Sequence, residues 1–195
     1  MRLGAPVSAW FCGLCLIWAG AAFFGLPGAQ ALGIEARAVA AGEVWRLGTY
    51  ALVHGAWWHL VANGVGIWMT GRWLERQVGS RAVAAVGLLG IAGGALGFLV
   101  TLALDPRLGP GMRCVGASGA LSALLGFVTG HWPREQLRVY LLGLPMTVRG
   151  VWLGGLLVLL MALEATLWPQ GTAYGAHLGA WGVGLLLGAA RRDRQ

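Results

Sequence analysis

The chain has 195 residues, of which 57% are hydrophobic and only 11% are charged, and its mean hydropathy is +0.70. A soluble domain has about 25% charged residues, so this composition excludes an ordinary water-soluble protein and predicts a membrane protein with one domain over 1–195. The net charge of +7 comes from arginine alone. These arginines flank apolar runs and form no basic stripe, so no nucleic-acid partner is expected.

Six apolar runs approach the roughly 20 residues that a helix needs to cross a bilayer. They cover residues 7–26, 57–74, 82–104, 114–131, 150–168 and 175–190. The first run has an alternative interpretation, because Met1-Arg2 before it and Ala29-Gln30-Ala31 after it also fit a cleaved signal peptide. The run is long for that purpose, so we favour a retained helix. The predicted fold is an all-α bundle of six transmembrane helices embedded in the lipid bilayer.

Arginine placement predicts the orientation of this bundle. Ten of the fourteen arginines lie at the two ends of the chain and in the second and fourth loops, and four lie in the other loops. The ten are Arg2, Arg72, Arg76, Arg81, Arg134, Arg138, Arg149, Arg191, Arg192 and Arg194. The positive-inside rule then predicts that both termini are cytoplasmic.

The first outer loop, residues 27–56, is long and amphipathic. It carries the aromatic residues Trp45 and Tyr50 as well as charged residues. Loops of this length in compact proteins are usually functional or have structure of their own. Tryptophan and tyrosine favour the membrane–water boundary. We therefore expect this loop to lie partly at the membrane interface.

Polar side chains inside three apolar runs are the strongest indication of function, because they are costly at membrane depth. His59 and Asn63 are four residues apart and share one helix face. Ser118 stands in a Gly-Ala-Ser-Gly motif, and His177 lies in the last run. Glycines at Gly184 and Gly188 follow His177 at helical spacing, and glycine allows close helix approach. Ser118, Ser122 and Gly126 follow one another at spacings of four on the fourth run. The region of Gly119 and Gly126 is the predicted partner of the last run, and this packing would bring Ser118 to His177.

These residue types together make a hydrolytic centre. Serine is a weak nucleophile until a base takes its proton, and histidine is the natural base near neutral pH. Glu164 is the only acidic residue within an apolar run and lies thirteen residues before His177. We expect it near the outer interface, so a two-residue dyad is predicted. Asn63, His59 and the Ser118 amide could stabilise an oxyanion, with Gly116 leaving room beside them.

Each residue taken alone has a simpler interpretation. A serine in a membrane helix usually bonds a carbonyl of its own helix. His177 could line an ion path or be a satisfied core histidine, and His59 and Asn63 could bond between helices. Cys12 and Cys15 have no second pair of ligands and are expected to pack against apolar neighbours. No metal and no organic cofactor is predicted.

The order and spacing of these motifs resemble the rhomboid intramembrane serine proteases along nearly the whole chain. The matching segments are Trp45-Arg46, His54-Gly-Ala-Trp-Trp-His59-Leu-Val-Ala-Asn63, Glu75 with Gly79, Gly116-Ala-Ser118-Gly119 and Ala176-His177-Leu-Gly179. The resemblance implies that Ser118 is the nucleophile, that His177 is the base, and that His59, Asn63 and the Ser118 amide stabilise the oxyanion. It also implies structural polar roles for His54 and Glu75.

One departure from the common family pattern concerns Ser122, where many bacterial members carry an aromatic residue that stacks on the histidine. Ser122 could orient His177 by a hydrogen bond, or it could be a small residue that lets two helices touch. A second departure is Ala180, three residues after the histidine, where glycine is frequent. The short six-helix form is similar to minimal prokaryotic members, which implies an inner-membrane protein.

The resemblance implies an endopeptidase whose partners are transmembrane protein substrates. Three alternatives stay open at this stage. They are a rhombosortase-like processor of C-terminal sorting tails, a non-catalytic rhomboid-like protein that binds membrane helices, and a small-ion or solute carrier. A carrier predicts inverted repeats, and the sequence has no internal repeat. Nothing in the sequence sets the oligomeric state or the physiological substrate.

Overall fold

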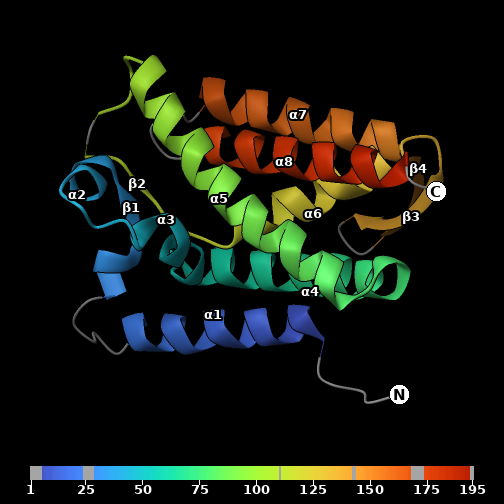
Figure 1. Ribbon diagram of the computed structural model, residues 1–195, viewed down its shortest axis with the longest axis horizontal. Coiled ribbons are helices and arrows are strands. Elements are labelled where there is room, and N and C mark those ends of the chain that lie inside the picture. Colours follow the sequence, from blue (N-terminus) through green and yellow to red (C-terminus); the bar gives the residue numbers. More distant parts are fainter. Residues whose placement is uncertain (1–5, 24–28, 110, 142–143, 168–173, 194–195) are drawn as a thin grey trace.

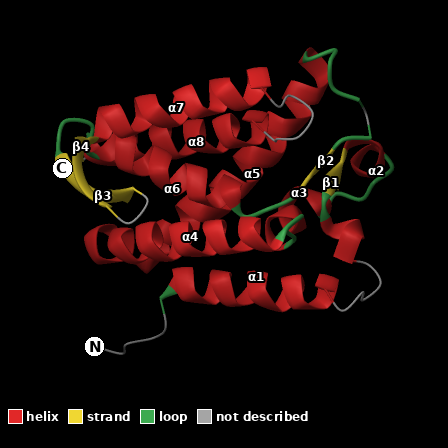
Figure 2. Ribbon diagram, turned by 180° about the vertical axis from the view of Figure 1, so that it is seen from behind, coloured by secondary structure: helices red, strands yellow, loops and turns green. Residues whose placement is uncertain are grey.

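A computed structural model describes residues 6–23, 29–109, 111–141, 144–167 and 174–193, and these are mostly helical (Figures 1 and 2). The longer helices are α1 (Val7–Phe23), α4 (Trp57–Val78), α5 (Ser80–Leu104), α6 (Ser118–His131), α7 (Gly150–Leu167) and α8 (Tyr174–Arg192). Each predicted apolar run therefore overlaps one of them over most of its length. The fourth run was predicted to start at 114, which is wrong, because the helix begins only at Ser118.

The helices form a bundle around α6, most of whose residues are buried. Helix α6 packs against α8, and both contact α5, which crosses the bundle obliquely (Figure 1). Helix α1 lies along α4 on one side, and α7 lies along α8 on the other. The start of α1 and the end of α8 lie at the same end of the bundle.

Glycines set the distance between α6 and α8, as the sequence predicted. A Cβ atom on Gly184 or Gly188 would collide with the carbonyl oxygen of Ala123 or Phe127 on α6. In the opposite direction, a Cβ on Gly126 would collide with the carbonyl of Trp181. Backbone therefore packs directly on backbone, which small residues allow in membrane proteins. This close contact fixes the relative position of the side chains that α6 and α8 carry.

The first loop folds into a compact unit at one end of the bundle. Its elements are η1 (Ala29–Leu32), β1 (Ile34–Glu35), α2 (Ala36–Ala40), α3 (Arg46–Thr49) and η2 (Tyr50–Leu52). Strand β1 pairs antiparallel with β2 (Arg113–Cys114), which directly precedes the serine motif. The loop thus has regular structure joined to the segment before Ser118, a pairing that the sequence analysis did not predict.

The fourth loop is a β-hairpin at the opposite end of the bundle (Figure 2). Strand β3 (Gln136–Leu141) pairs antiparallel with β4 (Leu144–Arg149). The sequence predicts an arginine-bearing loop here, and it did not predict that the loop would form two paired strands. The alternation of Leu137, Val139 with polar neighbours has the period of two that a strand requires.

Two of the described helices, α5 and α7, are long and apolar enough by themselves to cross a membrane. Helix α6 has 14 residues and at about 1.5 Å per residue is shorter than a bilayer core of about 30 Å. Large apolar side chains nevertheless face outward from several helices, including Ile17, Leu88, Trp152 and Leu186. An apolar exterior of this extent indicates contact with a membrane. The number of spans, six, stays a prediction.

Candidate active site

Ser118 is the first residue of α6, and the turn before it is unusually shaped. Gly116 has φ of +115°, which favours glycine because it lacks a Cβ atom. Its N–H donates to the Tyr50 carbonyl oxygen at 2.9 Å, which ties the turn to the first loop. The amide of Ser118 has no acceptor within its own helix because it lies in the first turn. The turn thus presents the Ser118 hydroxyl at the positive end of a helix dipole. Among the described residues, none accepts a hydrogen bond from the Ser118 N–H.

Ser118 and His177 are brought together by the close packing of α6 and α8. The Ser118 Oγ atom lies 2.8 Å from His177 Nε2, a normal hydrogen-bond length. Both residues are half-buried. A serine hydroxyl bonded to an imidazole nitrogen is the arrangement from which the proton can be transferred.

Glu164 corrects the prediction that no acid is placed near His177. Its Oε2 atom lies 3.0 Å from His177 Nδ1, on the side of the ring opposite Ser118. Its position near the end of α7, which runs beside α8, explains how a residue thirteen positions away in sequence reaches the ring. The described residues therefore contain a Ser118–His177–Glu164 chain of hydrogen bonds instead of an isolated pair.

His59 and Asn63 lie over the turn at Gly116. A Cβ atom built on Gly116 would be 2.5 Å from His59 Cε1, 2.8 Å from His59 Nε2 and 3.5 Å from Asn63 Nδ2. Among the described residues, the buried Nδ2 group of Asn63 has no hydrogen-bond partner. A buried donor without a partner is costly, so the amide is available for an acceptor that enters the site.

His54 supports the same turn from the first loop. Its Nε2 atom accepts a hydrogen bond from the Ala117 N–H at 3.3 Å, and its ring meets that of His59 edge to face at 5.2 Å. Burial lowers the pKa of His54 to about 4, well below the usual 6.5. The ring therefore stays neutral at neutral pH and keeps a lone pair for Ala117.

The remaining supporting residues hold the first loop and the other end of the bundle. Arg46 is buried and bonds the Gly33 carbonyl at 2.8 Å and the Glu43 carboxylate at 2.7 Å. Trp45 is 51% exposed and precedes α3. Glu75 accepts the N–H of Ser8 at 3.0 Å, which joins α4 to α1. None of these three contacts Ser118 or His177 by a hydrogen bond.

Ser122 does not orient His177, so the first of its two predicted roles is wrong. Both ring nitrogens of His177 already lie at hydrogen-bond distance from Ser118 and Glu164. Ser122 is buried on α6, next to Ala123, the residue that packs on Gly184. This environment agrees with the alternative of a small residue at a helix contact.

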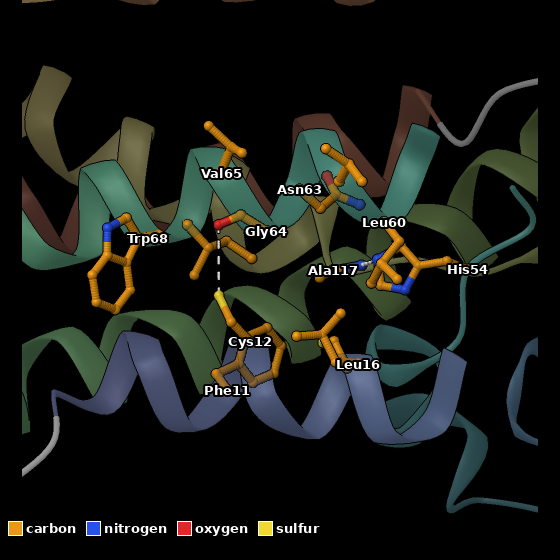
Figure 3. Close-up of a pocket in the computed structure, with 13 residues that line it drawn as sticks. Phe11, Cys12, Leu16, His54, Leu60, Asn63, Gly64, Val65, Trp68 and Ala117 are labelled. Carbon is orange, nitrogen blue, oxygen red and sulfur yellow. Dashed lines mark hydrogen bonds between the residues drawn. The ribbon is translucent and has the colours of Figure 1, made fainter. Parts of the chain in front are cut away.

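A pocket of about 270 Å³ lies between α1 and α4 beside this site (Figure 3). Asn63, His54 and Ala117 line it together with apolar side chains, whereas Ser118 and His177 do not. The Cys12 thiol lies 3.6 Å from the Gly64 carbonyl oxygen across it. The pocket therefore adjoins the turn before Ser118, which it reaches through Ala117.

Two residues shape the site without a clear signal in the sequence. The sequence places Glu164 near the outer interface, away from His177, and places Tyr50 only in the first loop. The Tyr50 hydroxyl donates to the Ile91 carbonyl oxygen at 2.9 Å and fits against Gly94 and Gly119. A buried tyrosine needs such an acceptor, but nothing in the local sequence indicates which helix supplies it.

Comparison with known proteins places this geometry in a family. Residues 41–194 match the model of the Rhomboid domain. Over 102 residues the chain is 36% identical to the protein named RHOMBOID-like protein 5 from Arabidopsis thaliana. That alignment covers 52% of this chain and 31% of the Arabidopsis protein.

Proposed function

The chain belongs to the rhomboid family, and from this membership and the site geometry we propose that it is an intramembrane serine endopeptidase. The Ser118–His177 hydrogen bond of 2.8 Å is the observation that carries the proposal. Ser118 is the proposed nucleophile and His177 the general base and acid. The partners are transmembrane protein substrates within the lipid bilayer, and the reaction needs no cofactor.

The proposed reaction proceeds through an acyl-enzyme. Ser118 Oγ bonds to the carbonyl carbon of the scissile peptide while its proton passes to His177 Nε2. The resulting tetrahedral intermediate collapses when the carbon–nitrogen bond breaks and His177 returns the proton to the leaving nitrogen. Water then attacks the acyl ester by the same proton path, which releases the acid product and restores the Ser118 hydroxyl.

The negative charge of the tetrahedral intermediate is proposed to lie beside Gly116. The Ser118 amide lies in the first turn of α6. The His59 ring and the Asn63 Nδ2 group, which has no hydrogen-bond partner among the described residues, lie over the turn at Gly116. Preorganised donors of this kind stabilise the transition state without reorganisation. Asn63, His59 and Ser118 are therefore the proposed oxyanion donors.

Replacing Asn63 by alanine is expected to lower kcat by about 10²-fold or less, with KM little changed. Loss of one oxyanion donor costs about 10²–10³ in a soluble protease, and His59 and the Ser118 amide can compensate here. Asn63→Asp keeps the shape but replaces the donor with a carboxylate, so it should be slower than Asn63→Ala. Steady-state kinetics on a transmembrane substrate measures both, and a wild-type kcat in both variants would assign Asn63 to packing.

The proposed substrate is a transmembrane helix cut where its helical hydrogen bonds are weak. A helix hides its amides in internal bonds, and membranes strongly favour that state. The scissile segment should therefore contain small or helix-weakening residues.

We further propose that the bundle crosses the membrane six times with both termini in the cytoplasm. The arginine distribution supports this orientation. The start of α1 and the end of α8 also lie at the same end of the bundle. A reporter enzyme active only outside the cytoplasm and fused after Gln195 should stay inactive. Activity of that fusion would contradict the proposed topology.

Labelling by a fluorophosphonate separates a protease from a rhomboid-like protein that only binds membrane helices. The proposed enzyme should be labelled on Ser118, because His177 activates this hydroxyl alone. The Ser122→Ala variant is a matched control, since Ser122 lies one turn along the same helix and should not carry the label. Absence of a covalent adduct on Ser118 in folded protein would favour the binding function.

A further inference from the structure

The Glu164 carboxylate determines which nitrogen of His177 carries the hydrogen atom. A carboxylate can only accept a hydrogen bond, so Nδ1, 3.0 Å away, is the donor. Nε2 then has a free lone pair, and it faces the Ser118 hydroxyl at 2.8 Å. The second ring nitrogen fixes the tautomer of the first in this way in many histidine sites. The tautomer that results is the one that a general base requires.

Glu164 also lies in a position where a carboxylate without a hydrogen-bonding or charged partner would be unfavourable. It is the one acidic residue of α7, whose other residues along Gly150–Leu167 are apolar apart from Thr166. Helix α7 contacts α6 about ten residues earlier, where Gly154 packs on Thr129. The side chain of Glu164 is 33% exposed and that of His177 is 19% exposed. Pairing between two such groups recovers part of the cost of placing them in an apolar surrounding.

We propose that Glu164 is a positioning residue for His177 and that this protein uses a Ser118–His177–Glu164 triad. This inference rests on the proposed function. During acylation the Ser118 proton moves to Nε2, the ring becomes an imidazolium, and the Nδ1–H stays bonded to the negatively charged Glu164. Glu164 itself takes up no proton and contacts no substrate. Its contribution is to orient the ring and to stabilise its positive charge.

The kinetic test compares Glu164→Gln with Glu164→Asp on a transmembrane substrate. Glutamine can present its amide NH₂ group to Nδ1, which favours the opposite tautomer and leaves Nε2 unable to accept. We expect kcat to fall about 10²–10³-fold with KM within about twofold, less than the roughly 10⁴ of a buried triad carboxylate because Glu164 is partly exposed. Glu164→Asp keeps the charge on a shorter side chain and should recover part of that loss.

Two control variants separate positioning from a structural effect. Thr166→Val alters the same end of α7, where the Thr166 hydroxyl bonds only carbonyls of its own helix. Glu135→Gln removes an exposed carboxylate just before the β3–β4 hairpin, at the other end of the bundle. Both should keep the wild-type kcat. A wild-type kcat in Glu164→Gln would overturn the assignment.

A second measurement reports on Glu164 without any reaction. Nitrogen NMR of protein labelled in its histidines distinguishes the two tautomers, and a His177→Asn variant identifies the His177 signals. The wild type should hold hydrogen on Nδ1, and Glu164→Gln should lose that preference. An unchanged His177 tautomer would refute the positioning role. A wild type that cleaves nothing but shows the expected change would refute only the proposed function.

Discussion

Replacing Ser118 by alanine is expected to abolish proteolysis while the protein still folds. The hydroxyl is the proposed nucleophile that forms the acyl bond, and its removal leaves the glycine-to-backbone contacts between α6 and α8 intact. In a soluble serine protease the loss of the nucleophile lowers kcat on the order of 10⁶-fold. Cleavage of a transmembrane substrate by purified variant, with its melting temperature as a check of folding, measures the effect.

His177→Ala and the double variant test whether the two residues act as a unit. Members of a catalytic unit are strongly non-additive, so His177→Ala should be nearly as inactive as Ser118→Ala and the double variant should lose little more. If the fractional activity of the double variant equals the product of the fractional activities of the two single variants, Ser118 and His177 act independently. Cleavage that persists in Ser118→Ala would remove the proposed nucleophile altogether.

Replacing Gly184 by alanine is expected to lower both stability and activity. The new Cβ atom would collide with the Ala123 carbonyl oxygen, and that atom belongs to backbone and cannot rotate away. Overpacking of this kind costs about 1–3 kcal/mol of folding free energy. Helix α8 can relieve the collision only by moving away from α6, which lengthens the bond of 2.8 Å between Ser118 and His177.

Gly182→Ala is the matched control, because it makes the same change two residues away on α8. A Cβ atom on Gly182 meets nothing within 4 Å. Alanine also favours a helix over glycine by about 1 kcal/mol, so this variant should be neutral or slightly stabilised. Thermal unfolding in detergent compares the two, and equal melting temperatures would contradict the close-packing explanation of the site.

The helices and the pairing of Ser118 with His177 could be predicted because both depend on local patterns. Apolar runs locate the helices, and the glycines that follow His177 at helical spacing indicate a close partner. The ends were less accurate. Helix α4 continues four residues past its predicted end at 74, because polar residues such as Glu75 extend a helix beyond the apolar core. Its end is set by Gly79, with φ of +88°.

The contact of Glu164 and the pairing of β1 with β2 could not be predicted, because they depend on contacts between separate segments. Whether Glu164 reaches His177 depends on the position of α7 beside α8, and no periodicity encodes that position. Strands β1 and β2 have two residues each, and four α-helices, α2 to α5, lie between them in the chain. Two residues are too few to show the alternation from which a strand is recognised. The sequence likewise leaves two roles open for Ser122, and the choice between them depends on the contacts of both His177 nitrogens with Glu164 and Ser118.

Mapping the cut in a panel of transmembrane substrates by mass spectrometry tests the central claim most directly. The purified wild-type protein in lipid is incubated with each substrate beside Ser118→Ala. The proposed function predicts one or few cleavage sites within or next to a transmembrane segment, at small or helix-weakening residues, and none with Ser118→Ala. Failure of the wild type to cut any member of the panel, or equal cutting by both proteins, would contradict it.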